Sequence, residues 1–122
     1  MMRNNPTGII IDDEKDIVDN LSMYLELKGH DIVGIGYNGC NAATLYSEKK
    51  PDYVVLDMKM PQYDGMYAIQ KIKEKDQNAK IFVITGHSEY DIENLVTKVI
   101  SKPFTLDKIE KIIKNTLPHN YE

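Results

Sequence analysis

The sequence predicts an α/β domain in which five parallel strands form one doubly wound sheet with helices on both faces. Two observations support this fold class. Five short apolar runs are rich in β-branched residues and lack polar alternation, as is typical of strands that are buried on both faces. Segments with apolar residues at helical spacing alternate with these runs, and this alternation is typical of right-handed crossovers between parallel strands.

The five apolar runs are the predicted strands. They lie at residues 8–11, 32–35, 53–56, 80–84 and 99–100. Periodicity does not fix their order in the sheet, but the flavodoxin-like order 2-1-3-4-5 is common among doubly wound sheets of five strands. In that order the first and third strands are neighbours at the topological switch point of the sheet.

Helical spacing predicts the helices that connect and follow these strands. The segments are 17–28, 42–46, 66–73 and 106–117, with a further helix expected roughly at 89–96. Gly29 is expected to end the first helix, because glycine readily adopts the left-handed conformation that follows many helices. Thr105 or Asp107 marks the start of the last helix, and Pro118 lies just past its end.

Length and composition limit the class of protein. The 122 residues suit one domain, which we expect to span 1–122 with a core from about 8 to 117. The chain ends about five residues after the last predicted helix, which predicts a stand-alone domain without an output domain. The single cysteine, Cys40, excludes an internal disulfide and fits a reducing cytosol.

Charge and hydropathy disfavour two classes of partner. The formal net charge of -4 argues against a general nucleic-acid binder. No apolar run approaches the length of a membrane span, and residues 1–6 lack the apolar stretch of a signal peptide. We therefore expect a cytoplasmic protein with no direct nucleic-acid binding and no membrane insertion.

Polar residues follow four of the predicted strands. They are Asp12-Asp13 after the first strand, Asp57 after the third, Thr85 after the fourth and Ser101-Lys102 after the fifth. Ligands of open α/β sheets bind beyond the carboxyl ends of the strands, at the switch point. We therefore expect three carboxylates, one hydroxyl group and one ammonium group to converge there.

The expected site suits a divalent cation and a phosphoryl group. Three carboxylates and the Lys102 ammonium leave a formal charge of -2, which one divalent ion balances. All the ligands are oxygens, which favours Mg²⁺ over Zn²⁺, and Mg²⁺ in proteins usually binds one or two carboxylates together with a phosphate. Asp57 is then a candidate nucleophile that forms an aspartyl-phosphate, while Lys102 and Thr85 hold the phosphoryl oxygens.

Each of these signals has an ordinary structural explanation when it is taken alone. The adjacent acids Asp12 and Asp13 are of the kind that helix N-termini favour, and the other residues fit turns or solvated loops. Their joint placement at four strand ends favours a site. Other polar residues keep the structural explanation: Lys108, Lys111 and Lys114 as a solvated helix face, His30, His87 and His119 without a metal role, and Cys40 as a small filler or surface thiol.

From about Gly8 to Leu117, the chain resembles the receiver domain of two-component response regulators. The matching segments are Asp12-Asp13 followed by Glu14, Asp57-Met58-Lys59-Met60-Pro61 with Asp64-Gly65, then Thr85, and Lys102-Pro103-Phe104. Their order and spacing agree with that family. Each segment alone is a weak signal, but the combination is specific.

The resemblance implies a role for each matching residue. Asp57 is the phosphoacceptor, and Mg²⁺ is bound directly by Asp13, Asp57 and the backbone carbonyl of Lys59. Asp12 acts mainly through metal-bound water. Thr85 donates a hydrogen bond to the phosphoryl group, and Lys102 pairs with a phosphoryl oxygen. The Lys102-Pro103 peptide is expected to be cis.

The resemblance also implies partners. A sensor histidine kinase, a phosphotransfer protein or a small phosphodonor supplies the phosphoryl group, and a downstream protein receives the signal by protein–protein contact. The domain is then not an enzyme that acts on a separate substrate, since its chemistry is limited to its own phosphorylation and dephosphorylation.

The sequence departs from the family pattern at two places. Val99 stands where the family usually has an aromatic residue, three residues before Lys102. Only 16 residues separate Thr85 from Lys102, fewer than is typical, so the fourth helix is expected to be short or distorted. Lys59 and His87 occupy variable positions that tune the loss of the phosphoryl group.

Three other functions are weighed against this one. A degenerate receiver, a scaffold that binds partners without phosphorylation, is favoured by Val99 and the short fourth helix. A phosphohydrolase with an aspartate nucleophile usually has a second acid two residues after the nucleophile, where this chain has Lys59. A flavin carrier needs a phosphate-binding loop after the first strand, where Asp12 and Asp13 would repel the phosphate.

Overall fold

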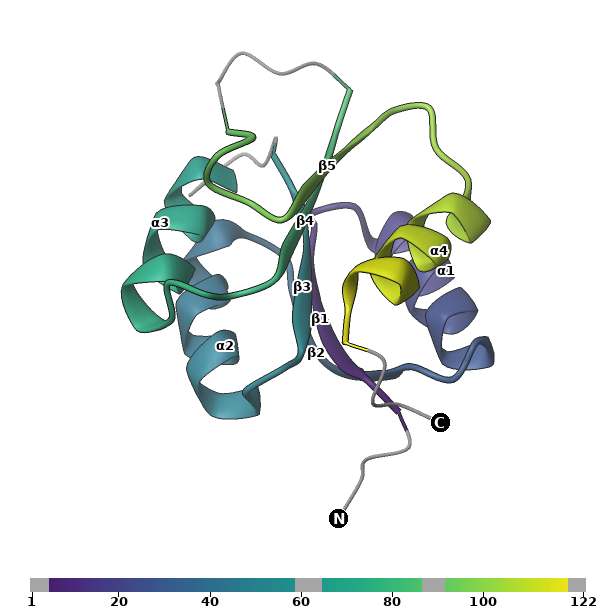
Figure 1. The fold of residues 1–122 in the computed structure, drawn as a ribbon, viewed down its shortest axis with the longest axis horizontal. Coiled ribbons are helices and arrows are strands. Elements are labelled where there is room, and N and C mark those ends of the chain that lie inside the picture. Colours follow the sequence, from purple (N-terminus) through teal and green to yellow (C-terminus); the bar gives the residue numbers. More distant parts are fainter. Residues whose placement is uncertain (1–4, 59–64, 87–91, 119–122) are drawn as a thin grey trace.

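Helices cover both faces of a central sheet in the computed structural model, which describes residues 5–58, 65–86 and 92–118 (Figure 1). The strands are β1 (Thr7–Ile11), β2 (Asp31–Gly36), β3 (Tyr53–Asp57), β4 (Ile81–Thr85) and β5 (Lys98–Ser101). The helices are α1 (Lys15–Leu27), α2 (Ala42–Lys49), α3 (Gly65–Lys75) and α4 (Leu106–Thr116), with a short 3-10 turn at Gly39–Asn41. Helices α2 and α3 lie on one face, and α1 and α4 on the other.

All neighbouring strands in the sheet are parallel, in the order β2-β1-β3-β4-β5. The predicted fold class and strand order are therefore confirmed. Every residue of β3 and β4 is buried, as their continuous apolar sequences predict for central strands. Since Ile11 pairs with Leu56 and Asp57 with Ile84, the ends of the three inner strands lie next to one another.

Alternate residues of each strand pack into two separate cores. Ile9, Ile11 and Leu56 contact the side chains of α2 and α3. Ile10 and Val55 lie on the opposite face, against α1 and α4. Burying both faces removes a large apolar area from water, which is the main source of stability for a domain of this size.

The helix ends follow the local sequence signals. Gly29 follows the C-cap residue of α1, Lys28, and has a φ of 94°, which confirms the predicted stop. Thr105 begins α4, and its Oγ1 accepts a hydrogen bond of 3.1 Å from the backbone N–H of Lys108. Of the two predicted starts of the last helix, Thr105 is therefore the N-cap residue.

The connection between β4 and β5 differs from the predicted helix. Residues 92–97 form a turn, so a helix that continues to Val96 is wrong, while 89–91 lie outside the described residues. The expectation of a short or distorted helix agrees with this turn. The reason is length, because 12 residues between Thr85 and Lys98 are near the minimum for a crossover between parallel strands.

Residues 92–97 are nevertheless packed against the domain. Ile92 is buried in the core below α2 and α3. Lys73 of α3 donates a 3.1 Å hydrogen bond from its ammonium group to the carbonyl of Leu95. Thr97 exchanges hydrogen bonds with the backbone of Ile81 through its own N–H and its hydroxyl oxygen. The turn therefore covers the sheet without a helix.

Candidate functional site

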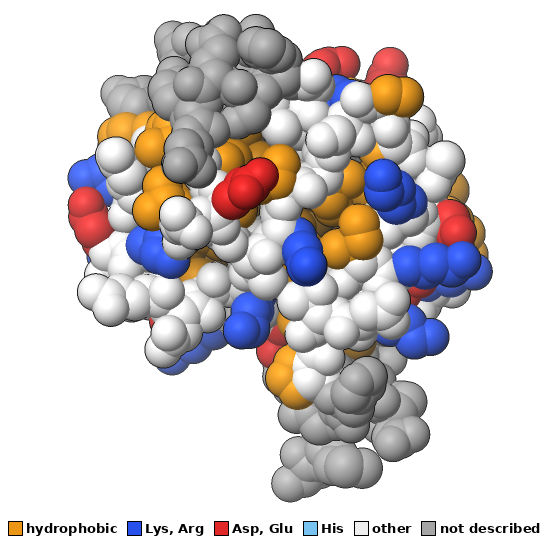
Figure 2. All heavy atoms as spheres, turned by 45° about the horizontal axis from the view of Figure 1, so that its top comes forward, with side chains coloured by type: hydrophobic (Ala, Val, Ile, Leu, Met, Phe, Trp, Pro, Cys, Tyr) orange, Lys and Arg blue, Asp and Glu red, His pale blue; other side chains and the backbone are white. Residues whose placement is uncertain are grey.

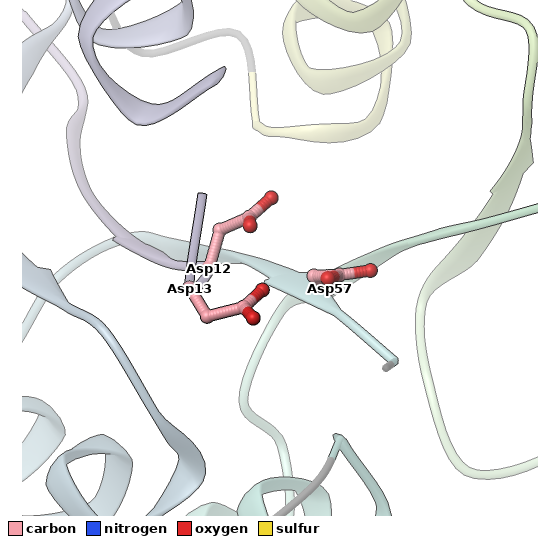
Figure 3. A group of neighbouring side chains, drawn as sticks. All are labelled: Asp12, Asp13 and Asp57. Carbon is pink, nitrogen blue, oxygen red and sulfur yellow. The ribbon is translucent and has the colours of Figure 1, made fainter. Parts of the chain in front are cut away.

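The ends of β1 and β3 bring three carboxylates together. Asp12 and Asp13 follow the last residue of β1, and Asp57 is the last residue of β3. One carboxylate oxygen from each lies within 4.8 Å of the others. Figure 3 shows the three side chains gathered beyond the strand ends. The predicted convergence of these acids is therefore observed.

The three carboxylates differ in their exposure to solvent. The exposed fractions of Asp12 and Asp57 are 5% and 4%, whereas Asp13 is the most exposed of the three. Buried carboxylates are unusual unless a cation or a hydrogen-bond donor compensates their charge. Asp12 accepts a 2.9 Å hydrogen bond from the backbone N–H of Glu14, two residues ahead.

The pKa of Asp12 is raised mainly by burial and further by the neighbouring carboxylates. Burial is the largest cause, and together with the neighbouring Asp57 and Asp13 carboxylates it raises this pKa from 3.8 to about 6. The hydrogen bond from Glu14 acts in the opposite direction and is the second-largest effect. A bound cation would oppose the rise, since it favours the ionised form of each carboxylate.

Thr85 and Lys102 border the acidic group. Thr85 is the last residue of β4, buried, and its carbonyl accepts a 2.9 Å hydrogen bond from the backbone N–H of Lys102. The Lys102 ammonium nitrogen lies 3.9 Å from Oδ1 of Asp57. The Lys102-Pro103 peptide is cis, as expected. All five predicted side chains therefore lie at the same edge of the sheet.

The chain returns closely to Asp57 at the start of α3. The backbone N–H of Gly65 donates a 3.0 Å hydrogen bond to the carbonyl of Met58. A Cβ atom at position 65 would lie 2.6 Å from Sδ and 2.7 Å from Cα of Met58, so the close approach requires glycine. Lys59, with its predicted carbonyl ligand, lies outside the described residues, as does His87.

The donor set fits Mg²⁺. The metal-ligand atoms that Asp12, Asp13 and Asp57 bring together are all carboxylate oxygens, the ligands that hard divalent cations prefer. Two of the acids are buried and mutually repulsive, which is costly without a positive partner beyond Lys102. The three aspartates therefore fit the Mg²⁺ ion that the sequence pattern predicts.

On the face in Figure 2, lysine side chains lie among acidic and apolar ones in the coloured part. Lys108, Lys111 and Lys114 are exposed on α4, in agreement with a solvated helix face. No helix in the described part of the chain is long and apolar enough to cross a membrane.

Residues 9–114 match the response regulator receiver domain family. The chain belongs to this family. Receiver domains of two-component response regulators act in phosphorylation-type signalling and are typically not enzymes.

Solved structures of receiver domains share this fold. The response regulator TrrA from Thermotoga maritima, in complex with Mg²⁺ and BeF, is 27% identical, with a TM-score of 0.82 over 92% of this chain and 99% of that chain. A receiver domain protein from Clostridium thermocellum is 25% identical, with a TM-score of 0.82 over 91% and 93%. A chain of the CheX–CheY–BeF3–Mg complex from Borrelia burgdorferi is 24% identical, with a TM-score of 0.82 over 89% and 87%.

Proposed function

We propose that this receiver domain, with its core at about 8–117, accepts a phosphoryl group on Asp57 in a Mg²⁺-dependent reaction. The single observation that carries the proposal is the convergence of three carboxylates within 4.8 Å, with the Lys102 ammonium 3.9 Å from Asp57. Such a group is costly to maintain for stability alone, because like charges at short distance oppose folding. It is the arrangement that a metal-assisted phosphoryl transfer requires.

The acidic residues would hold the metal. Asp13 and Asp57 would bind Mg²⁺ directly, together with the carbonyl of Lys59, and Asp12 would act through metal-bound water. When bound, Mg²⁺ supplies positive charge to the oxygens of the transferred group. The burial and the neighbouring carboxylates that raise the pKa of Asp12 both disfavour its ionised form, and this supports a cation at this place.

The chain's own groups carry out the transfer. A carboxylate oxygen of Asp57 attacks the phosphorus of the donor, the bond from phosphorus to the leaving group breaks, and the leaving group retains the electron pair. The Lys102 ammonium pairs with one phosphoryl oxygen, and the Thr85 hydroxyl donates a hydrogen bond to another. Low exposure of Asp57 restricts the approach of the donor to the open edge of the sheet.

The donor and the output are proteins of the same signalling system. A sensor histidine kinase or a phosphotransfer protein supplies the phosphoryl group, and a small phosphodonor can replace it. The aspartyl-phosphate then shifts the domain between two conformations at a surface that a downstream protein binds. The complex of TrrA with Mg²⁺ and BeF and the CheX–CheY complex support such chemistry and such partners by analogy.

A second candidate is a scaffold that binds partners without phosphorylation. Val99 in place of an aromatic residue favours it, as does the turn at 92–97 in place of a helix. The resemblance implies that this aromatic residue swings inward as the threonine moves and that the fourth helix is part of the output face. The complete acidic group and Lys102 favour the phosphorylated switch.

Intact-protein mass after incubation with acetyl phosphate and Mg²⁺ tests the proposal. We expect the mass of one phosphoryl group to be gained, and the gain to be absent in Asp57→Asn and in a sample with excess chelator. Asp52→Asn is a matched control, because Asp52 is an acid at the opposite end of β3. If wild-type protein gains no mass and Mg²⁺ does not bind, the scaffold is the better description.

A further inference from the structure

A second group of buried polar side chains lies at the opposite edge of the sheet. The Nδ1 atom of His30 is 2.8 Å from the hydroxyl oxygen of Tyr53, and its Nε2 atom is 3.0 Å from Oε2 of Glu110. His30 is 4% exposed, Glu110 7% and Tyr53 0%. Among the described residues, His30 and Glu110 are the buried polar or charged side chains that lie outside the acidic site.

One arrangement of protons satisfies this cluster. The Tyr53 O–H donates to Nδ1 of His30, and the Nε2–H of the ring donates to the Glu110 carboxylate. Burial, with the charges of Glu110, Asp52 and Asp31, raises the pKa of Tyr53, so its hydroxyl keeps the proton that it donates. The ring joins β3 to α4, and the His30 backbone N–H donates to Leu25 of α1.

The strand next to Tyr53 is shaped to accept its ring. A Cβ atom at Gly8 of β1 would lie 2.4 Å from Cζ and 2.7 Å from the hydroxyl oxygen of Tyr53. Phe82 meets the same ring edge-on, with centroids 6.1 Å apart. The position of the Tyr53 hydroxyl is therefore fixed by packing on both neighbouring strands.

The polar contacts of α4 are stronger in its middle, where Glu110 pairs with His30, than in its first turn. Near the start, exposed Asp107 accepts hydrogen bonds of 3.2 Å from the Tyr24 hydroxyl and 3.1 Å from Lys111, and exposed pairs of this kind contribute little. Near the middle, Ile109 and Glu110 are buried, and breaking a buried pair is costly. Beside the apolar packing of Ile109 and Ile113, the helix therefore has a buried polar attachment at Glu110.

The weakly held start of α4 is also the part nearest the acidic site. Only residues 103–105 separate Lys102 from the first residue of the helix. Figure 1 shows α4 entering from β5 and lying beside α1. The resemblance implies that an aromatic residue at position 99 and a fourth helix carry the signal to the surface, and this chain has Val99 and the turn at 92–97 instead. We therefore look for a path from the site through Lys102 to α4.

We propose that Glu110 pins α4 to His30 and Tyr53, and that phosphorylation tilts the first turn of α4 about this pin. This inference rests on the proposed function, because the movement begins when Lys102 is drawn to the phosphoryl group. The signal then leaves the domain through the exposed first turn of α4, while the remainder of the helix stays in place.

Hydrogen exchange followed by NMR tests the pin in full-length protein with Mg²⁺ and beryllofluoride as the phosphoryl mimic. The amides of Lys108 and Ile109, both bonded to Thr105, report on the first turn, and the Leu117 amide, bonded to Ile113, reports on the end. In wild type we expect the exchange rates of the two first-turn amides to change about tenfold when the mimic is added. The exchange rate of the Leu117 amide should change less than about twofold.

Two variants and a control complete the experiment. In Glu110→Leu we expect the mimic to change the exchange rate of the Leu117 amide as well as those of the first turn. In Tyr53→Phe, which removes one hydroxyl, we expect a smaller change at Leu117 of the same sign. Lys114→Gln, at an exposed site on α4, should retain the wild-type pattern. If Glu110→Leu is too unstable to fold, Tyr53→Phe decides the outcome.

The failures of the two proposals are distinguishable. Fluorine NMR detects bound beryllofluoride, and its absence from wild type overturns the proposed function together with this inference. A bound signal with equal changes along α4, or with variants that keep the wild-type pattern, overturns the pin alone.

Discussion

At the carboxyl edge of the sheet, three carboxylates lie within 4.8 Å, and burial and mutual repulsion raise the pKa of Asp12 to about 6. At the amino edge, by contrast, the buried carboxylate of Glu110 has a hydrogen-bond donor 3.0 Å away in His30. Both groups contain buried polar side chains, and β3 contributes to both of them, through Asp57 and Tyr53. The proposed Mg²⁺ would complete the first group, whereas the partners in the second group all come from the chain.

This difference separates function from stability within one small domain. In the proposed function, the first group responds to an external cation and a phosphoryl group. A group whose partners all come from the chain holds the fold together and is unresponsive to the same ligands. We therefore expect substitutions at the two edges to change different measurements.

The largest expected effect is at the amino edge. His30→Leu leaves the Glu110 carboxylate buried without its donor, which should destabilise the domain by about 3–5 kcal/mol, the usual cost of breaking a buried pair. Urea denaturation in the presence of chelator measures it. The double variant His30→Leu/Glu110→Leu should recover most of the loss, because it removes both polar partners. Equal losses in the single and double variants would contradict the pairing.

The second effect is at the carboxyl edge and depends on pH. Because the pKa of Asp12 is 3.8 ordinarily and about 6 in the folded protein, the folded state binds more protons between these values. Without metal, this group's contribution to stability is therefore greatest in acid and is lost as pH rises through 6. Asp12→Asn should be more stable than wild type at pH about 7.5 by up to about 3 kcal/mol, and not at pH about 4.

The same variant separates the apo protein from the metal-bound one. Its advantage over wild type should shrink or reverse in saturating Mg²⁺, because the cation stabilises the ionised acids of the wild-type site. Urea denaturation at both pH values, with chelator and with Mg²⁺, provides the four comparisons. A stability difference between the variant and wild type that is the same in all four comparisons would mean that ionisation of Asp12 does not destabilise the metal-free protein.

The sequence contained most of the information about the carboxyl edge. Parallel strands place their carboxyl ends together, so residues after the strands could be assigned to one site from their positions alone. Asp12, Asp57 and Thr85 follow or end strands that are apolar throughout, and the order of a doubly wound sheet supplied their neighbours. The positions of these side chains therefore depended only on strand boundaries and order.

The amino edge could not be predicted in the same way. His30 and Glu110 are 80 residues apart, and their contact depends on how α4 rotates against the sheet. One signal was present, since Glu110 adjoins Ile109 on the apolar face of a predicted helix, but it named no partner. The turn at 92–97 was predicted only as a short or distorted helix for a related reason, because a short crossover has no periodicity of its own.

A smaller effect on function is expected from Lys102→Ala. The variant removes the ammonium 3.9 Å from Asp57, and we expect phosphorylation by acetyl phosphate to slow about tenfold, because a partly exposed cation stabilises the transferred charge less than a buried one. Stability should change little. Lys98→Ala, an exposed site on β5, the strand that Lys102 follows, is the matched control. A variant phosphorylated as fast as wild type would remove Lys102 from the transfer step.

The smallest effect sharpens the contrast along α4. Asp107 lies one turn before Glu110, and the Lys111 ammonium, its main partner, holds the pKa of Asp107 below its ordinary value. Any stabilisation is therefore present at neutral pH and lost as pH falls through that pKa. Because both groups are exposed to water and salt, Asp107→Asn should leave the urea midpoint indistinguishable from wild type. A clear shift at Asp107 would mean that the first turn of α4 is held as firmly as its middle.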